Sequence, residues 1–266
     1  MVRDIPGALE RFREIAERIG ERRPFLFLDF DGTITPIVAR PELAVIDAAV
    51  RDLLGRLARL CPVAVISGRD LADLRGRIGL DGIYYAGCHG FEIEGPNSLS
   101  YANDEGLGAI PALEGAESEL RSKLAGIGGI LFERKRFSLG IHYRLTSDQD
   151  VPVIERAVNE ALAHHGGLRR KDGKRVFELQ PDVAWDKGEA VLWLLRALGH
   201  DGPGVMPIFI GDDLTDEDAF CALLDRGIGI VVFDRPRPTA AAYRLHDPGE
   251  LRRFLGDLAR LLESGP

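Results

Sequence analysis

Four short apolar runs, each followed by a polar turn, constrain the fold of this chain most. Within each run hydrophobicity is continuous rather than alternating, which is typical of strands buried on both faces, as in a parallel sheet. The runs are residues 25–28, 63–66, 208–210 and 228–233. Helical patterns, with apolar residues three and four positions apart, occupy residues 50–60, 187–198 and 251–262. Strands that alternate with helices indicate an open α/β sheet.

The middle of the chain has a different pattern. Residues 136–144 and 174–179 alternate between apolar and polar side chains, as strands with one buried face do. The Asp172-Gly173 pair predicts a hairpin turn, and two helical stretches, 113–125 and 151–165, would cover the apolar face. We therefore expect an α+β domain at residues 108–181, inserted into an α/β core formed by residues 1–107 and 182–266.

Composition excludes several classes of function. The net charge of −8 argues against nucleic acid as the main partner, because a phosphate backbone demands a basic face. The three cysteines form neither a disulfide framework nor a zinc-binding pattern, which favours a reducing compartment. The first ten residues lack the apolar centre of a secretory signal, and no apolar run is long enough to cross a bilayer. The sequence therefore predicts a cytoplasmic protein without a membrane partner.

Two carboxylates follow the first apolar run. Asp29 and Asp31 are two residues apart, so their side chains are expected to share a face at the carboxyl end of a strand, where open α/β sheets bind ligands. Two adjacent carboxylates repel each other, and a divalent cation would keep a nucleophilic carboxylate ionised. Alone, however, an Asp-x-Asp-Gly segment is as readily an ordinary polar turn.

Other polar groups stand at similar places. Ser67 follows the second run and offers a hydroxyl to a phosphate oxygen, although a helix-opening turn would also explain it. Lys187 begins a helical pattern, where a lone lysine is usually a solvated charge. Residues 211–218 are rich in acids, which the first turn of a helix favours, and Asp212 lies nearest the strand. Carboxylate ligands without a nearby histidine or thiolate suit magnesium.

Taken in order, these segments resemble the motifs of the haloacid-dehalogenase-like (HAD) phosphohydrolases. The matching residues are Asp29-Phe30-Asp31-Gly32-Thr33, Ser67, Lys187 and Gly211-Asp212-Asp213, with Asp216 beyond. The resemblance implies a Rossmann-like, mostly parallel sheet with an inserted cap domain.

The resemblance also implies a role for each matching residue. Asp29 would attack phosphorus and become an aspartyl-phosphate, and Asp31 would protonate the leaving oxygen and then activate water. Ser67 and Lys187 would hold the phosphoryl oxygens. Mg²⁺ would be held by Asp29, Asp212 and the backbone carbonyl of Asp31. Supporting positions around this site would be Thr33, Asp213 and Asp216.

Finer motifs resemble those of the trehalose-6-phosphate phosphatases. They lie at residues 28–37, 86–90, 141–144 and 211–220, with Ile34 and Cys88 as mild departures. The resemblance implies hydrolysis of trehalose 6-phosphate and a cap that closes over the sugar, with hinges near residues 108 and 181. The expected substrate contacts are Gly68, Arg69, His89, Glu133, Lys135, His142, Arg144, Lys174 and Glu178. For any one cap residue, an ordinary charge on an exposed strand is the competing interpretation.

Three readings stay open from the sequence, and hydrolysis of trehalose 6-phosphate is the first of them. The substrate could be another sugar phosphate, such as sucrose 6-phosphate or mannosyl-3-phosphoglycerate, on the same scaffold. A non-catalytic phosphosugar sensor is a third reading, which the presence of Asp29, Asp31, Lys187 and Asp212 disfavours. If the first reading is right, a trehalose-6-phosphate synthase is the expected functional partner.

Overall fold

The computed structural model describes residues 5–38, 40–173, 175–233 and 237–264. The chain divides into two compact units, a large one formed by Met1–Tyr101 with Trp185–Pro266 and a small one formed by Ala102–Ala184. This division lies a few residues from the predicted boundaries. Helix α4 (Asp104–Gly108) belongs to the small unit, because it packs against α5 (Ile110–Lys123).

The large unit is built on one mostly parallel sheet. Within the described residues it has eight strands in the order β12-β11-β10-β1-β2-β3-β4-β5. Strands β1 to β3 and β10 to β12 are parallel, and β4 pairs antiparallel with β3. The bounds are β1 (Arg23–Leu28), β2 (Val63–Ile66), β3 (Tyr84–Gly87), β4 (Glu92–Gly95), β5 (Leu99–Ala102), β10 (Val205–Gly211), β11 (Ile228–Val232) and β12 (Tyr243–Leu245). The four apolar runs of the sequence are β1, β2, β10 and β11, so the predicted α/β class is confirmed.

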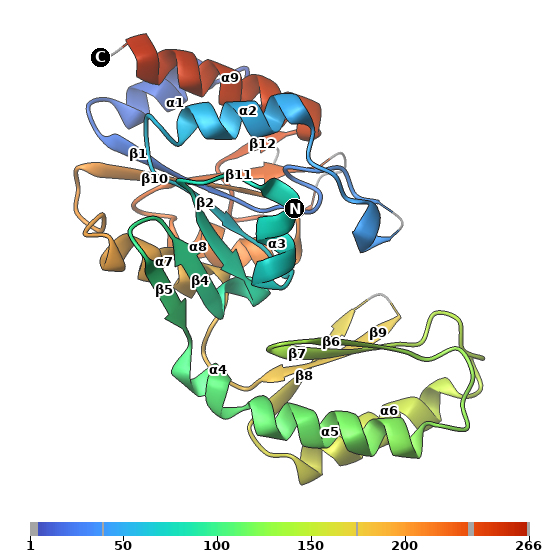
Figure 1. Ribbon diagram of the computed structural model, residues 1–266. Coiled ribbons are helices and arrows are strands. Elements are labelled where there is room, and N and C mark those ends of the chain that lie inside the picture. The colour runs from blue at the N-terminus through green and yellow to red at the C-terminus, as the bar shows by residue number, and fades with distance from the viewer. Residues whose placement is uncertain (1–4, 39, 174, 234–236, 265–266) are drawn as a thin grey trace. The chain divides into compact units, whose positions relative to one another are not determined.

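Helices cover both faces of this sheet (Figure 1). On β1, Leu26 and Leu28 point to one face and Phe25 and Phe27 to the other, as the two-residue period of a strand requires. The first face packs against α1 (Phe12–Ile19), α2 (Ala48–Leu57), α3 (Leu71–Ile78) and α9 (Pro248–Ser264). The second face packs against α7 (Lys187–Ala197) and α8 (Glu217–Ala222). The sheet is therefore buried on both sides, so residues that could contact a ligand are expected at the ends of its strands.

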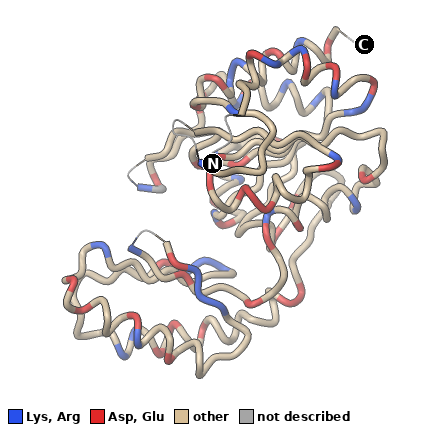
Figure 2. Tube along the Cα trace, turned by 180° about the vertical axis from the view of Figure 1, so that it is seen from behind, with Lys and Arg blue, Asp and Glu red and all other residues tan. Residues whose placement is uncertain are grey.

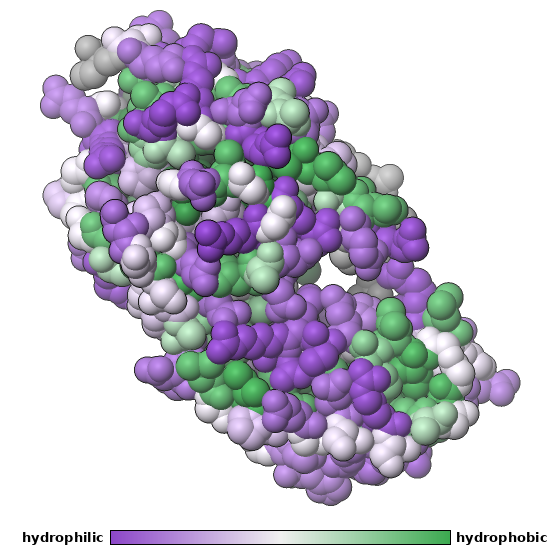
Figure 3. Space-filling model, in the orientation of Figure 1, coloured by the Kyte–Doolittle hydropathy of each residue, from purple (hydrophilic) through white to green (hydrophobic). Residues whose placement is uncertain are grey.

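The small unit is an antiparallel sheet with helices on one face. Its strand order is β6-β7-β9-β8, with bounds β6 (Leu131–Lys135), β7 (Ser138–His142), β8 (Leu168–Gly173) and β9 (Val176–Pro181). Leu139, Ile141, Phe177 and Leu179 form its core with α5 and α6 (Val151–His164). Alternation places the intervening side chains on the other face. Figure 2 shows charged positions along these strands, and Figure 3 shows apolar patches among hydrophilic residues on this unit.

The predicted hairpin is present between β8 and β9, but its turn follows the Asp172-Gly173 pair instead of containing it. The antiparallel ladder pairs Gly173 with Val176, so β8 runs through Asp172 and Gly173 and the turn comes after them. Arg175 has a φ of +65°, which shows that the left-handed turn conformation falls there rather than on the glycine. The pairing of β8 with β9, rather than the Asp-Gly pair, therefore decides where the turn lies.

Short 3₁₀ helices complete the large unit: η1 (Pro41–Leu43), η2 (Cys88–Gly90) and η3 (Leu214–Asp216). Among the described residues, none of the helices combines the length and the apolar character that a membrane crossing requires.

Candidate active site

The carboxyl ends of two neighbouring strands bring the first acids together. β1 and β10 are paired in parallel with Leu28 opposite Ile210, and the backbone N–H of Asp29 donates to the carbonyl of Ile210 at 2.9 Å. Asp29 and Asp212 therefore leave the sheet side by side. This juxtaposition is what the rule for ligand sites in open α/β sheets predicts.

A third carboxylate joins them. Oxygen atoms of Asp29, Asp212 and Asp216 all lie within 4.8 Å of one another. Asp216 is completely buried at the end of η3, where its Oδ2 accepts the backbone N–H of Asp213 at 2.8 Å. Asp213 and Asp216 thus cap each other reciprocally, and this fixes the Asp216 carboxylate inside the cluster.

The side chain of Lys187 neutralises part of this charge. Its Nζ donates to Asp29 Oδ1 at 2.6 Å and to Asp216 Oδ1 at 2.7 Å, and the lysine is 2% exposed. Lys187 is the first residue of α7, whose N-terminus is capped by Asp186 through the N–H of Glu189. Burial alone would lower the pKa of Lys187, but the charges of Asp216 and Asp29 raise it above the usual lysine range. Lys187 is therefore not a solvated surface charge.

The surroundings of Asp29 and Asp212 raise the pKa of both carboxyl groups and so disfavour their ionised forms. Burial raises the pKa of Asp29 well above its usual range, and the charges of Asp216 and Asp212 add to this while Lys187 opposes it. Burial and the charge of Asp216 raise the pKa of Asp212 to about 7. One buried ammonium does not balance three clustered carboxylates, so the site holds an excess of negative charge.

The donor set fits a hard divalent cation. The side chains of Asp29, Asp212 and Asp216 offer carboxylate oxygens, which are ligands that suit Mg²⁺ better than softer metals. Gly32 adopts a φ of +90°, and a Cβ there would lie 2.1 Å from Asp212 Oδ2, so only glycine lets this loop approach the carboxylate. Thr33 donates its hydroxyl to Asp212 Oδ1 at 3.1 Å and holds it in place. The residues present therefore suit a bound metal ion.

The carboxylate of Asp31 is bound by Arg69 rather than by Lys187. Arg69 donates to it through Nε and Nη2, both at 2.6 Å, and Nη1 of the same side chain reaches Asp73 at 2.8 Å. Arg69 was expected as a substrate contact. The structure places its guanidinium on Asp31.

The loop after β2 is tightly folded against the loop after β3. The backbone N–H of His89 donates to the carbonyl of Ser67 at 2.8 Å, and the N–H of Cys88 donates to that of Arg69 at 2.7 Å. A Cβ on Gly68 would lie 2.8 Å from the His89 imidazole, so the ring lies directly over Gly68. Cys88 and His89 have φ values of +49° and +58°, an unusual conformation for two consecutive non-glycine residues. Ser67, Gly68 and His89 therefore form one local structure.

Several expected sugar contacts lie together on the small unit. Glu133 accepts a hydrogen bond from the His142 ring at 2.8 Å, and Lys135 lies 3.6 Å from Glu133. The His142 hydrogen bond lowers the pKa of Glu133 to about 2, with the charge of Lys135 acting in the same direction against burial. Glu178 pairs with Gly140 in the same sheet. Arg144 follows β7, and Lys174 lies outside the described residues.

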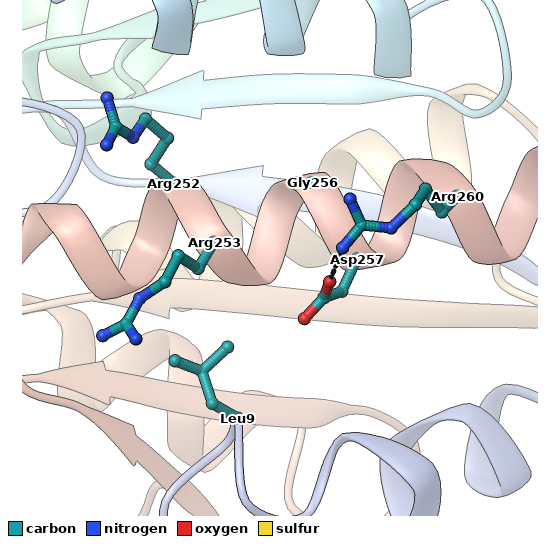
Figure 4. Close-up of a pocket in the computed structure, with 6 residues that line it drawn as sticks. All are labelled: Leu9, Arg252, Arg253, Gly256, Asp257 and Arg260. Carbon is teal, nitrogen blue, oxygen red and sulfur yellow. Dashed lines mark hydrogen bonds and ion pairs between the residues drawn. The ribbon is translucent and has the colours of Figure 1, made fainter.

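A surface hollow on α9 does not carry comparable chemistry. It has a volume of about 460 Å³ and is lined by Leu9, Arg252, Arg253, Gly256, Asp257 and Arg260 (Figure 4). Its one acidic lining residue, Asp257, is ion-paired with Arg260. The hollow therefore lacks the clustered carboxylates that distinguish the ends of β1 and β10.

Comparison with known proteins decides the family. The sequence model of the trehalose-phosphatase family matches residues 27–249. The chain belongs to the trehalose-phosphatase family. Trehalose-phosphate phosphatase of Mycobacterium tuberculosis is 43% identical over 266 residues, which cover 98% of this chain and 68% of that protein. The recognition of this family from the sequence motifs is confirmed.

Solved structures agree with the family assignment. A trehalose-6-phosphate phosphatase related protein is 26% identical, with a TM-score of 0.75 over 91% of this chain and 100% of that one. A haloacid dehalogenase-like hydrolase from Bacteroides thetaiotaomicron is 17% identical, with a TM-score of 0.63 over 91% of this chain and 99% of that one. The second likeness shows the fold alone, and with the first it confirms the predicted HAD-like architecture.

Sequence reasoning missed two features of the site. It assigned Asp216 a supporting role, whereas the carboxylate lies among the cluster oxygens and contacts Lys187. The three-residue spacing of Asp213 and Asp216, which fits a reciprocal cap, was the available signal. It also missed Asp73, which contacts Arg69 from four residues further along the same turn and helix, and this spacing was the available signal.

Proposed function

We propose that this chain hydrolyses trehalose 6-phosphate to trehalose and inorganic phosphate, with Asp29 as the nucleophile. The observation that carries the proposal is the buried contact of Lys187 with Asp29 inside a carboxylate cluster, in a member of the trehalose-phosphatase family. A buried nucleophile fixed by a cation, next to hard metal ligands, suits phosphoryl transfer.

The first step transfers the phosphoryl group to the protein. Lys187 engages Oδ1 of Asp29, and we assign the attack on phosphorus to Oδ2. As the new O–P bond forms, the bond from phosphorus to the sugar oxygen breaks. Asp31 gives a proton to the leaving oxygen, which becomes the free hydroxyl of trehalose. Ser67 and Lys187 hold phosphoryl oxygens while charge moves across the group.

The second step regenerates the enzyme. A water molecule attacks the phosphorus of the aspartyl-phosphate, and Asp31 takes up its proton. The bond between phosphorus and Asp29 breaks, which releases phosphate and restores the carboxylate. Asp31 is thereby returned to its protonated form for the next cycle.

Magnesium is the cofactor we propose, held by Asp29, Asp212 and the backbone carbonyl of Asp31. The position of Asp216 in the cluster makes it a further candidate for contact with the ion. When bound, Mg²⁺ supplies the positive charge that offsets the carboxylates and the transferring phosphoryl group.

Sugar recognition is assigned to the small unit. The charged side chains that share its helix-free face, such as Glu133, Lys135 and His142, are strong hydrogen-bond partners for sugar hydroxyls. A cap role for residues 102–184, with hinges at the two crossings, follows as part of the proposal.

The cellular setting is also proposed. The cysteines Cys61, Cys88 and Cys221 are free thiols, which suits a reducing compartment such as the cytoplasm. A trehalose-6-phosphate synthase would supply the substrate.

A phosphate-release assay across sugar phosphates tests the function. Trehalose 6-phosphate should give the highest kcat/KM, above sucrose 6-phosphate, mannosyl-3-phosphoglycerate and glucose 6-phosphate. Equal or faster turnover of one of the others would reassign the substrate. Binding of trehalose 6-phosphate without release of phosphate from any compound would indicate a non-catalytic sensor.

A further inference from the structure

The Asp31 carboxylate is held by a guanidinium fork. Arg69 Nε donates to Oδ2 and Nη2 donates to Oδ1, each at 2.6 Å, so both oxygens and the plane of the carboxylate are fixed. Bidentate pairs of this kind are strong and directional, because two parallel hydrogen bonds leave little rotational freedom.

Asp73 and Arg77 hold the Arg69 side chain in place. Its Nη1 donates to Asp73 Oδ2 at 2.8 Å, and Nε of Arg77 donates to both oxygens of Asp73 at 2.9 and 2.8 Å. Arg69, Asp73 and Arg77 are spaced four residues apart along α3 and the turn that precedes it, which puts them in one row. Arg77 Nη1 also donates to the carbonyl of Ala44 at 2.9 Å, and the Arg69 guanidinium lies 5.3 Å from the centre of the Phe30 ring.

The two partners of the fork differ in exposure. The side chain of Arg69 is 9% exposed, whereas that of Asp31 is 42% exposed. The guanidinium is therefore covered, and the carboxylate is the more accessible member. This asymmetry suits an arginine that supports a reacting group rather than one that reaches for a ligand.

We propose that Arg69 is a positioning residue, which orients the ionised Asp31 carboxylate for the step in which it takes up the proton of the attacking water, and which is anchored by Asp73 and Arg77. In this role Arg69 acts through Asp31 and not on the phosphoryl group. The inference rests on the proposed function, because the proton transfers of Asp31 belong to it.

Substrates whose leaving groups differ in basicity distinguish an arginine that acts through Asp31 from one that acts on the phosphoryl group. A sugar alkoxide must be protonated as it leaves, whereas the p-nitrophenolate of p-nitrophenyl phosphate leaves without a proton. The pre-steady-state burst of p-nitrophenolate therefore reports the attack of Asp29 without help from Asp31. Both Arg69→Lys and Asp73→Asn should lower kcat on trehalose 6-phosphate by about tenfold or more, while the burst rate constant stays within about twofold. A burst rate that falls as far as the sugar-phosphate rate would contradict the proposal.

A double-mutant cycle gives an independent criterion. If Arg69 acts only through Asp31, adding Arg69→Lys to Asp31→Asn should change the residual rate by less than about twofold. A further loss of about tenfold in the double variant would show that Arg69 acts on the substrate directly and would overturn the inference.

Arg75→Gln is the matched control. Arg75 lies on the same helix but pairs with Glu94 at the surface, so all rates should stay at the wild-type level. Thermal unfolding of each variant checks folding, and Arg77→Gln replaces Arg69→Lys if the latter is unfolded. If wild-type protein releases phosphate from glucose 6-phosphate but not from trehalose 6-phosphate, the substrate assignment fails, and the same comparison with glucose 6-phosphate still decides the role of Arg69.

Discussion

The ammonium group of Lys187 lies 2.6 Å from Oδ1 of Asp29, and both side chains are almost completely buried. The same ammonium lies 2.7 Å from Asp216, so one cation joins the end of β1 to the end of η3. Residues 29, 187 and 216 are far apart in the sequence. Their contact therefore ties the start of α7 and the loop after β10 to Asp29.

Removing the cation should harm both stability and activity. Lys187→Met leaves Asp29 and Asp216 without their buried positive partner, and breaking a buried ion pair in this way typically costs about 3–5 kcal/mol. We expect a free energy of unfolding lower by about 3 kcal/mol in metal-free protein and a loss of detectable turnover. Urea denaturation and phosphate release measure the two effects. Arg196→Met, an exposed position on the same helix, should change neither.

Gly32 should tolerate no side chain. An alanine Cβ would lie 2.1 Å from Asp212 Oδ2, and the φ of +90° is strained for any L-residue. Gly32→Ala should therefore displace Asp212 and lower kcat/KM by about 100-fold or more. Gly76→Ala is the opposite case, because the residue lies inside α3 with no atom within 4 Å of its Cβ position. It should keep full activity and gain about 0.5–1 kcal/mol in stability. Similar losses in both variants would contradict this reading of Gly32.

Magnesium affinity should depend on pH through Asp212. Burial and the charge of Asp216 raise its pKa from 3.8 to about 7 in the metal-free protein, and the carboxyl must be ionised to bind Mg²⁺. Affinity measured by calorimetry should rise with pH up to about 7 and then level off.

The metal-free protein should show the opposite trend in stability. A group with a raised folded pKa stabilises the fold while it is protonated, and this contribution is lost as pH rises from about 4 through 7. The unfolding temperature without metal should fall over that window, and Asp212→Asn should flatten the curve. A wild-type curve that is flat or rises would contradict the prediction.

Glu133 should contribute to stability in acid. The His142 hydrogen bond lowers its pKa from 4.5 to about 2, so its contribution is complete above pH 4.5 and is lost as pH falls towards 2. Glu133→Gln and His142→Gln should each reduce the steepness of acid unfolding in that window, as followed by circular dichroism. An acid limb identical to wild type in both variants would show that the contact does not persist in solution.

The sequence was sufficient for the central strands but not for β3. The runs that became β1 and β10 are apolar on both faces, so their burial could be read directly. β3 has the sequence Tyr-Tyr-Ala-Gly, which carries little hydrophobic signal, and its place in the sheet depends on pairing with β2. The alternating segments of the small unit predicted β7 and β9 correctly, because one face of each is buried.

The candidate site was predictable where a motif lies at a strand end. Asp29 and Asp212 follow buried strands, so their approach could be expected from topology alone. The fork between Asp31 and Arg69 could not, because it depends on the path of two loops and on the anchoring of Arg69 by Asp73. Likewise, the acid-rich sequence after β10 did not reveal that Asp216 points into the cluster while Asp213 is exposed.

Detection of a phosphorylated Asp29 tests whether Asp29 is the nucleophile that attacks phosphorus. Protein mixed with ³²P-labelled trehalose 6-phosphate and quenched in acid within milliseconds should carry label on the peptide that contains Asp29. Hydroxylamine should remove this label, as it does for an acyl phosphate, and Asp29→Asn protein should show neither label nor turnover. Turnover by Asp29→Asn, or release of phosphate by wild-type protein with no label at Asp29 at any quench time, would exclude Asp29 as the nucleophile.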